Sequence, residues 1–329
     1  MKFDAPPYFY EIYGTTLESE IPFPELGPVQ IDGKNRQNKI SFRINNFDQS
    51  SFVEKESLPG FTYWFGPDLR TIVVDSPSLG QFRLCPQERV IDWKRSNPCS
   101  IDFARTVLKG NVLSLLLSHL PSLLILHGNV LALDGKGIVL CGPRQEGKST
   151  FTAALLNEGF SLLSDDIVVI EKTKNAFVVR PGAPEIRLWP QSVSLLKSLP
   201  IRGRLLYPRT QKERFLIDSK NTWRFTRKVV PLKAIYLLTR RKTGRILIQD
   251  LKGREGLMAF LKNIYWGVIR DPKTRERQFE IGSELFDKIP IKRLTYPSGF
   301  NHFLPLKRAL MKDLKGRSGV GVARSQRGE

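Results

Sequence analysis

The chain has 329 residues, 41% of them hydrophobic and 26% charged, with a formal net charge of +20. Its length suits two domains, and three cysteines without a CxxC pair or a Cys/His cluster argue against a disulfide framework or a zinc site and favour a reducing cytoplasm. The positive charge favours acidic partners, but no helix-turn-helix, RRM or zinc-finger signature supports binding to nucleic acid.

Residues 1–105 predict a separate, β-rich N-terminal domain. The segments YFYEIYG, KISFRI, FTYWFG and TIVVDS cluster or alternate β-forming residues between turn residues, which favours mostly antiparallel strands. The first residues contain no apolar core of the length found in signal peptides.

Residues 102–120 predict a buried or amphipathic helix. The most apolar stretch, 112–126, is interrupted by His119 and Pro121 and is too short to span a bilayer, so we expect no membrane segment. An α/β pattern follows, with strands over LLILHGNVLAL and GKGIVLCG and a helix over KSTFTAALLNEG that ends at Gly159.

The α/β pattern continues with FSLLSDDIVVIEK, which predicts a strand, an acidic pair and a second strand. PLKAIYLLTRR and RILIQDL predict further strands, and REGLMAFLKNIYWGVI predicts a helix that closes near Arg270. Residues 106–311 are therefore expected to form one α/β domain. Residues 312–329, which are polar, basic and contain glycine, are expected to form a disordered tail.

Basic residues are concentrated between positions 202 and 245, where only Glu213 and Asp218 oppose them. A solvated face is the simplest interpretation of any one of them, but together they predict a positively charged surface. They are Arg202, Arg204, Arg209, Lys212, Arg214, Lys220, Arg224, Arg227, Lys228, Lys233, Arg240, Arg241, Lys242 and Arg245.

A phosphate-binding motif, G-x-x-x-x-G-K-S, lies between the second α/β strand and its helix. The expected nucleotide-binding residues are Gly142, Pro143, Arg144, Gln145, Glu146, Gly147, Lys148, Ser149 and Thr150. Loop amides and the helix N-terminus would bind phosphate oxygens, Lys148 would reach the β- and γ-phosphates, and Ser149 would hold Mg²⁺. The acidic Glu146 either pairs with Arg144 or points to solvent.

Three further residues, Asp165, Asp166 and His127, are candidates for a catalytic function at this loop. Asp165 and Asp166 follow it after one helix and one short strand, a spacing that is expected to return the chain beside the strand of the phosphate-binding loop. One carboxylate can bind the metal or its water and the other can accept a proton from an attacking hydroxyl, whereas a turn or helix cap is the structural alternative. His127 ends an apolar strand just upstream and is either catalytic or structural.

The segment LHGNVLALDGKGIVLCGPRQEGKSTFTAALLNEGFSLLSDDIVVI resembles the catalytic core of HPr kinase/phosphorylase and its relatives, bacterial Ser kinases with a P-loop of the phosphoenolpyruvate-carboxykinase type. A His-Gly pair, a loop ending in Gly-Lys-Ser and an Asp-Asp pair match without gaps. The resemblance implies that Lys148 and the loop bind ATP, that Ser149 binds Mg²⁺ and that Asp166 is the general base. It also implies that Asp165 supports Asp166 or the metal and that His127 assists at the transferred phosphate.

The match to this family continues in PEIRLWPQSV, where Glu185, Ile186 and Arg187 occupy a Glu-Ile-Arg segment. Glu185 is therefore a candidate metal contact, with an ordinary surface carboxylate as the alternative. The family's following Gly-Leu-Gly is replaced by LWP, so we do not expect phosphorylase activity.

The segments YEIYGTTLESEIPFPEL and IRLWP are similar to a divergent group of HPr-kinase-like proteins that includes kinases of lasso-peptide precursors. The sequence therefore predicts a kinase that uses ATP and Mg²⁺ and phosphorylates a Ser of a peptide or protein, for which the basic region permits an acidic acceptor. A nucleotide-binding regulatory protein without phosphotransfer and a small-molecule kinase are the alternatives. The oligomeric state is left open.

Overall fold

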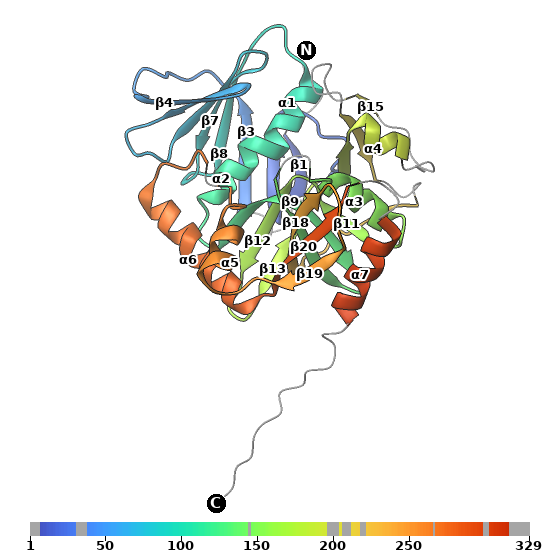
Figure 1. Cartoon of the computed structure of the whole chain (residues 1–329). Coiled ribbons are helices and arrows are strands. Elements are labelled where there is room, and N and C mark those ends of the chain that lie inside the picture. The colour runs from blue at the N-terminus through green and yellow to red at the C-terminus, as the bar shows by residue number, and fades with distance from the viewer. Residues whose placement is uncertain are drawn as a thin grey trace, which may run out of the picture.

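The computed structural model describes residues 7–30, 38–143, 146–195, 204–205, 212–217, 222–265, 267–298 and 303–315. These residues form a mixed α/β structure with two large sheets and one small one. The first sheet lies at the upper left of Figure 1, the second sheet lies below it, and a helical segment runs between them. The predicted division at residues 105 and 106 falls within that helical segment.

The N-terminal region is rich in β-structure, as the sequence predicts. Eight strands lie in the spatial order β1-β2-β3-β8-β7-β6-β5-β4. Their bounds are β1 (Tyr8–Ile12), β2 (Thr15–Ser19), β3 (Lys39–Ile44), β4 (Glu54–Leu58), β5 (Phe61–Phe65), β6 (Ile72–Ser76), β7 (Gly80–Cys85) and β8 (Val90–Arg95). Neighbouring strands are antiparallel except at β2–β3 and β3–β8, which are parallel because β3 and β8 are reached by longer connections.

The helical segment predicted over residues 102–120 is confirmed, with an added irregularity. It comprises α1 (Ile101–Val107), a π-helix, η2 (Leu108–Val112), and α2 (Leu113–Ser118). The Ser100 side chain caps its start by accepting from the Phe103 backbone N–H. Residues of this segment pack in one hydrophobic cluster with the first sheet and with β9, so the two parts of the chain share a core.

The second sheet closes on itself. Its strands are β9 (Leu123–Leu133), β10 (Lys136–Cys141), β11 (Ser161–Ser164), β12 (Ile167–Lys172), β13 (Phe177–Arg180), β17 (Arg224–Phe225), β18 (Val230–Arg241), β19 (Leu247–Asp250) and β20 (Ile291–Pro297). Strands β9, β12, β13, β18 and β10 pair in sequence, and β10 returns to β9, which gives a barrel-like ring. The long strands β9 and β18 make this possible because each pairs with different neighbours along its length.

The strand predicted over LLILHGNVLAL is confirmed as β9, but His127 lies in its middle, so the prediction that His127 ends a strand is wrong. The strand continues because Gly128 allows β10 to approach closely: a Cβ atom at Gly128 would lie 2.6 Å from the carbonyl oxygen of Leu140 and 2.9 Å from Cys141 Sγ. The glycine of the His-Gly pair therefore has a packing function.

A small sheet and five further helices complete the described part of the chain. The sheet has the order β14-β16-β15, with β14 (Glu185–Leu188), β15 (Arg204–Leu205) and β16 (Glu213–Leu216). The helices are α3 (Lys148–Leu156), α4 (Pro190–Leu195), α5 (Gly253–Leu261), α6 (Pro272–Lys288) and α7 (Phe303–Lys315). In Figure 1, α5 and α6 lie on one side of the barrel-like sheet and α3 and α7 on the other.

Two predicted boundaries in the C-terminal half are wrong. Helix α5 ends at Leu261 and not near Arg270, because the chain turns to contact β9, where the Tyr265 backbone N–H donates to the Ile125 carbonyl at 2.8 Å. Helix α7 runs to Lys315, so the first residues of the predicted tail are helical. Residues 316–329 lie outside the described residues.

Helix α7 extends beyond position 312 because one of its faces is apolar. Leu306, Leu310 and Leu314 are buried in the cluster that also contains α3 and the small sheet. The Asp313 carboxylate accepts from the Tyr236 hydroxyl at 2.7 Å, which fixes the last turn against β18.

In the part of the chain that the structure describes, no helix has the length and apolarity needed to cross a bilayer. Cys85, Cys99 and Cys141 are free thiols. Burial raises the pKa of the Cys141 thiol to about 12, which makes it unreactive as a nucleophile.

We predict that Leu310→Ala lowers the free energy of unfolding by about 2–5 kcal/mol, because it removes a fully buried side chain and leaves a cavity. The matched control is Leu304→Ala on the same helix, where the side chain is 51% exposed and the change should stay within about 0.5 kcal/mol. Urea denaturation measures both. Equal effects of the two variants would show that α7 is not packed as described.

Candidate active site

The loop that the sequence predicts to bind phosphate joins β10 to α3, which is the predicted strand–loop–helix arrangement. Gly147 precedes the helix with φ +77°, and a Cβ atom there would lie 2.9 Å from the Tyr296 hydroxyl, so both backbone and space require glycine. Lys148 is the first residue of α3, and Ser149 follows it half-buried. Arg144 and Gln145 lie outside the described residues.

Lys148 is directed back at its own loop. Its Nζ donates to the carbonyl oxygens of Gly142 at 2.7 Å and Pro143 at 2.8 Å, and the residue is 8% exposed. Burial lowers the pKa of Lys148, while the charges of Asp166 and Asp165 act in the opposite direction. The ammonium group therefore lies within electrostatic range of the acidic pair.

Two other loop residues are engaged with neighbouring elements. The Glu146 carboxylate accepts from the backbone N–H of Arg240 in β18, and its carbonyl accepts from the Tyr296 hydroxyl. The Thr150 and Ser192 hydroxyls are hydrogen-bonded at 2.7 Å, which ties α4 to the first turn of α3.

Asp165 and Asp166 form the turn between β11 and β12. Both of these strands pair with β9, which in turn pairs with β10. The acidic turn is therefore one strand away from the strand of the phosphate-binding loop, and the prediction that it lies directly beside that strand is wrong. The β9–β10 hairpin places β9 between them.

Asp166 has a left-handed backbone, with φ +74°, and strand β9 holds it in place. The Gly128 backbone N–H donates to the Asp166 carbonyl at 3.1 Å, and the Asp166 backbone N–H donates to Asn129 Oδ1 at 3.2 Å. Asn129 Nδ2 in turn donates to Thr152 Oγ1 of α3 at 2.9 Å. Asn129 thus links the acidic turn to the helix of the phosphate-binding loop.

The side chain of Asp166 is held from both sides. His127 Nδ1 lies 3.5 Å from Oδ1, and Arg187 Nη2 donates to Oδ2 at 2.7 Å. Burial alone would raise the pKa of Asp166, but the charges of Arg187 and His127, together with more distant lysines, lower it well below its usual range. The side chain is 36% exposed, so this carboxylate is ionised and open to solvent.

Asp165 differs from its neighbour because it is buried. Its side chain is 5% exposed, and Oδ2 accepts from the Arg187 backbone N–H at 2.9 Å, while Oδ1 has no hydrogen-bond partner. Burial raises the pKa of Asp165 to about 6, although Arg187 opposes the shift. Two adjacent carboxylates therefore have different protonation equilibria, which permits different tasks.

The residues fit a magnesium ion that is bound mainly through a nucleotide. No group of three or more His, Cys, Asp and Glu side chains capable of holding a metal ion is found among the described residues. Mg²⁺ in nucleotide enzymes needs only one or two protein ligands besides phosphates and water. The unpartnered Oδ1 of Asp165 and the hydroxyl of Ser149 are suitable oxygen ligands.

Glu185 is a buried carboxylate that is paired with a lysine. It is 7% exposed, so it is not a surface carboxylate. Lys109 Nζ donates to its Oε2 at 2.7 Å, and Arg214 Nη1 lies 3.9 Å from the same oxygen. Burial would raise the pKa of Glu185, but Lys109 lowers it. A metal contact would have to compete with an ammonium already in place.

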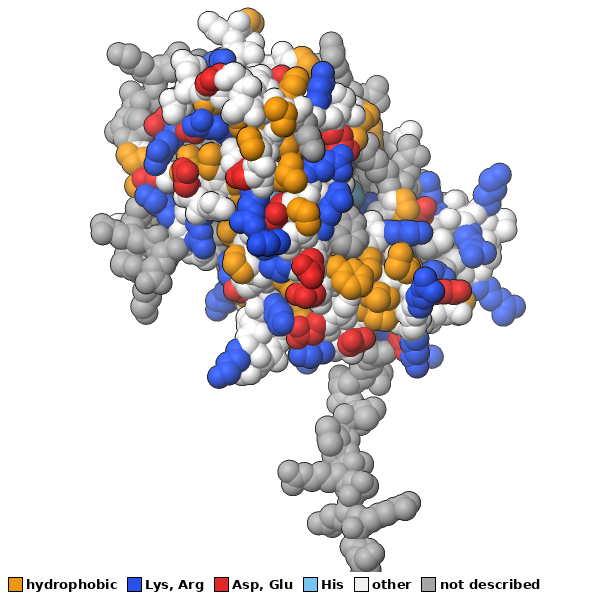
Figure 2. Space-filling model, turned by 90° about the vertical axis from the view of Figure 1, so that its left-hand side faces the viewer, with side chains coloured by type: hydrophobic (Ala, Val, Ile, Leu, Met, Phe, Trp, Pro, Cys, Tyr) orange, Lys and Arg blue, Asp and Glu red, His pale blue; other side chains and the backbone are white. Residues whose placement is uncertain are grey.

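The basic region at 202–245 is not one continuous surface. Arg214 is buried, Arg227 donates to the Leu26 carbonyl at 2.9 Å, and Lys233 donates to the Leu314 carbonyl at 2.7 Å. On a different face, the left-hand side of Figure 1, Lys and Arg side chains are interspersed with Asp and Glu (Figure 2). Arg202, Arg209 and Lys220 lie outside the described residues.

Sequence reasoning assigned no function to Asn129, Arg187 or Lys109. A buried Asn inside an apolar strand was a usable signal for Asn129, because such a side chain needs partners. The match of the Glu-Ile-Arg segment pointed to Arg187 without a function. No local pattern marks Lys109, whose contacts come from residues distant in the sequence.

No protein-family model matches this sequence, and no curated protein matches it. Among solved structures, the chain is similar to the HPr(Ser) kinase/phosphatase from Coxiella burnetii, with 14% sequence identity and a TM-score of 0.31. The match covers 58% of this chain and 97% of that chain. A similarity this low carries no argument for function, which has to rest on the site.

The pKa of Asp165 predicts a pH dependence of stability. Because burial raises this pKa from 3.8 to about 6, the folded protein retains a proton that the unfolded chain releases between these values. The stability contributed by this carboxyl is therefore present below its unfolded pKa and is lost as pH rises through its folded pKa. Asp165→Asn should abolish this loss, so that from pH 4 to 7 the variant gains up to about 3 kcal/mol relative to the original protein.

Urea denaturation of both proteins at several pH values across this range measures the effect. Leu304→Ala, which removes an exposed side chain and no titratable group, is the control and should give a difference that does not change with pH. A constant difference for Asp165→Asn would contradict the raised pKa.

Proposed function

We propose that the chain is a kinase that transfers the γ-phosphoryl group of ATP to a hydroxyl, that of a Ser in a peptide or protein. One observation carries this proposal: Asn129 joins the Asp165–Asp166 turn to the helix that follows the phosphate-binding loop, because its Oδ1 accepts from the Asp166 backbone N–H at 3.2 Å and its Nδ2 donates to Thr152 Oγ1 at 2.9 Å. Phosphate binding by the loop requires the lysine but no carboxylate. The ionised carboxylate beside it supports transfer to a hydroxyl.

Asp166 is the proposed general base. Its depressed pKa makes it ionised at neutral pH and therefore ready to accept a hydrogen bond from an acceptor hydroxyl. Phosphoryl transfer passes through a loose transition state, so a weak base suffices because the base orients the hydroxyl and receives its proton late. His127 and Arg187 contact different oxygens of this carboxylate and so fix its plane, and each oxygen retains a lone pair.

Lys148 and the loop amides are the proposed phosphate ligands. Nucleotide phosphates would replace the Gly142 and Pro143 carbonyls as acceptors from Nζ, and would gain from the N-terminal dipole of α3. Ser149 and Asp165 would be the protein ligands of a magnesium ion bound through the nucleotide, which would act as a Lewis acid and neutralise phosphate charge.

The outer face of β14 supports a peptide or protein as acceptor. Side chains alternate along a strand, so Arg187 faces the acidic pair while its neighbours Ile186 and Leu188 are buried in the core. Just beyond the strand, Trp189 is 44% exposed and Lys212 Nζ lies 5.3 Å from its ring centroid. An exposed aromatic ring with a cation beside it suits an extended acidic segment. A lasso-peptide precursor as acceptor is supported only by the sequence resemblance.

A nucleotide-binding regulator without phosphotransfer is the second candidate. The contact of Arg187 with Asp166 favours it, because the proposed base is already paired. Formation of ADP and free phosphate in the presence of Ser peptides, with no phosphorylated peptide, would support this candidate over the kinase.

We predict that Asp166→Asn lowers phosphoryl transfer by about 10²- to 10⁴-fold, because the amide cannot accept the hydroxyl proton. ATP should still bind, as measured by calorimetry, since Lys148 and the loop are unchanged. Transfer is measured by mass spectrometry of a library of Ser-containing peptides after incubation with ATP and Mg²⁺. Asp287→Asn is the matched control, and undiminished transfer in Asp166→Asn would refute the assigned base.

We also predict that Arg187→Gln shifts the acidic limb of the pH–rate profile to higher pH. Arg187 lowers the pKa of Asp166, so its removal raises that pKa, and the base becomes protonated at a higher pH. The profile of kcat against pH from 4 to 8 measures the shift. Arg275→Gln, a substitution on α6, is the control, and an unshifted limb in Arg187→Gln would count against Asp166 as the group that titrates.

A further inference from the structure

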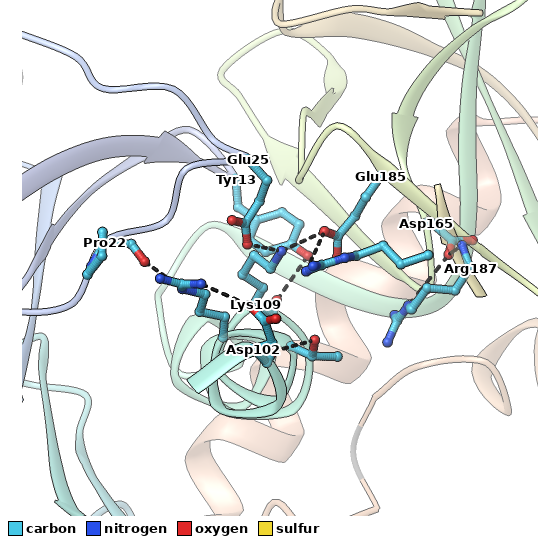
Figure 3. A network of polar contacts seen from close by, with 11 residues as sticks. Tyr13, Pro22, Glu25, Asp102, Lys109, Asp165, Glu185 and Arg187 are labelled. Carbon is cyan, nitrogen blue, oxygen red and sulfur yellow. Dashed lines mark hydrogen bonds and ion pairs between the residues drawn. The ribbon is translucent and has the colours of Figure 1, made fainter. Parts of the chain in front are cut away.

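A buried group of three charged side chains, Glu25, Lys109 and Glu185, joins the N-terminal domain to the candidate active site (Figure 3). Lys109 Nζ lies 2.5 Å from Glu25 Oε1 and 2.7 Å from Glu185 Oε2. The three side chains are 4%, 3% and 8% exposed, in chain order. Buried charges are costly even when they are paired, so this group is a poor device for stability alone.

The π-helix η2 places Lys109 between the two carboxylates. Short π-helical turns are rare and are often found at functional sites, because they displace a side chain from the regular helical position. The Tyr13 hydroxyl donates to the Lys109 carbonyl at 3.1 Å. Tyr13 follows β1 and Glu25 follows β2, so the N-terminal domain holds both the backbone and the ammonium group of Lys109.

Glu185 transmits this restraint to the acidic pair through β14. It lies two residues before Arg187 and so points to the same face of the strand. One small cavity is lined by Tyr13, Lys109, Asp165, Glu185 and Arg187. Lys109 and the buried Asp165 therefore adjoin the same cavity. The direction of these side chains toward one another is visible in Figure 3.

The surroundings of Glu185 are rich in positive charge. Arg214 Nη1 lies 3.9 Å from its Oε2 and is buried without a hydrogen-bond partner, and Arg187 also interacts with the carboxylate electrostatically. While the Lys109 ammonium lies between Glu25 and Glu185, a divalent cation at Glu185 would have to displace it and would also meet these two arginines at short range in a poorly solvated space. With Lys109 in place, the donor set therefore fits an ammonium and does not fit a metal ion.

We propose that the Lys109 ammonium takes the place of a divalent cation at Glu185 and acts as a positioning residue that holds β14, and with it Arg187, against Asp165 and Asp166. The N-terminal domain is then a necessary part of the active site. The catalytic consequence rests on the proposed kinase function, whereas the occupancy of Glu185 is tested independently of it.

Binding of Mn²⁺ to the full chain, followed by electron paramagnetic resonance without nucleotide, tests the occupancy. We expect Glu185→Gln to leave the Mn²⁺ stoichiometry unchanged. We expect Lys109→Met to gain one Mn²⁺ site, because Glu25 and Glu185 then face each other without a cation, and Lys109→Met/Glu185→Gln to lose it again. A Glu185-dependent Mn²⁺ site in the original protein, or no added site in folded Lys109→Met, would overturn the proposal.

A neutral variant keeps the test decisive if removal of one charge prevents folding. Glu25→Gln/Lys109→Met/Glu185→Gln removes all three charges together, which folded proteins tolerate better than one unpaired buried charge. Circular dichroism verifies its fold. If this variant binds fewer Mn²⁺ ions than the original protein, the carboxylates held a metal and the proposal fails; an equal number supports it.

The same neutral variant tests the positioning function. We expect kcat for peptide phosphorylation to fall roughly ten- to a hundredfold, the usual effect of losing a group that orients a reacting one, while KM for ATP stays unchanged. A purely structural contribution would lower only the melting temperature and would contradict the positioning role. Absence of phosphorylation by the original protein would refute the kinase proposal and leave the Mn²⁺ result intact.

Discussion

Two adjacent carboxylates, those of Asp165 and Asp166, share the guanidinium group of Arg187. The protonation states of the two carboxylates depend on how this one positive charge is divided between them. Arg187 binds Asp166 through its side chain and Asp165 mainly through its backbone N–H. The better-paired carboxylate stays ionised, whereas burial raises the pKa of the other to about 6. Backbone contacts from β9 keep the turn in a left-handed conformation that the chain would not adopt unaided. Strand β9 therefore fixes the position of the acidic turn, whereas Arg187 of β14 and burial determine the protonation states of its two carboxylates.

The strand that supplies Arg187 is itself held by the helical segment that follows the first sheet. The Tyr13–Gly14 turn packs against β13, where the Arg180 guanidinium donates to the Gly14 carbonyl at 2.9 Å. Lys109 adds a buried ionic contact to β14, and a common hydrophobic cluster runs from the first sheet to β9. The first sheet supplies none of the sequence-predicted site residues, yet it restrains the site together with the helical segment that holds Lys109, because their contacts fall on β9, β13 and β14.

Much of the local structure could be predicted because it depends on neighbouring residues. The strands that were predicted from alternating β-forming residues are found where expected. The same holds for the glycine-bounded loop and the helix after it. Predictions that needed distant partners were less accurate. The acidic turn was expected beside the strand of the phosphate-binding loop, but hairpin pairing put β9 between them. The tail was expected to begin at residue 312, but residues up to Lys315 belong to α7, because the apolar face of this helix packs against a distant cluster.

The sequence by itself determined the strand–loop–helix around Lys148, the acidic pair and the His-Gly step, since each depends on residue types at short, fixed spacings. Tertiary structure alone decided which charges meet. Glu185 looked like a metal contact or a surface carboxylate, and it became a buried partner of Lys109 because residues far apart in the chain converge on one cavity. Electrostatic energy depends on distance in space and on burial, and neither is encoded in local spacing.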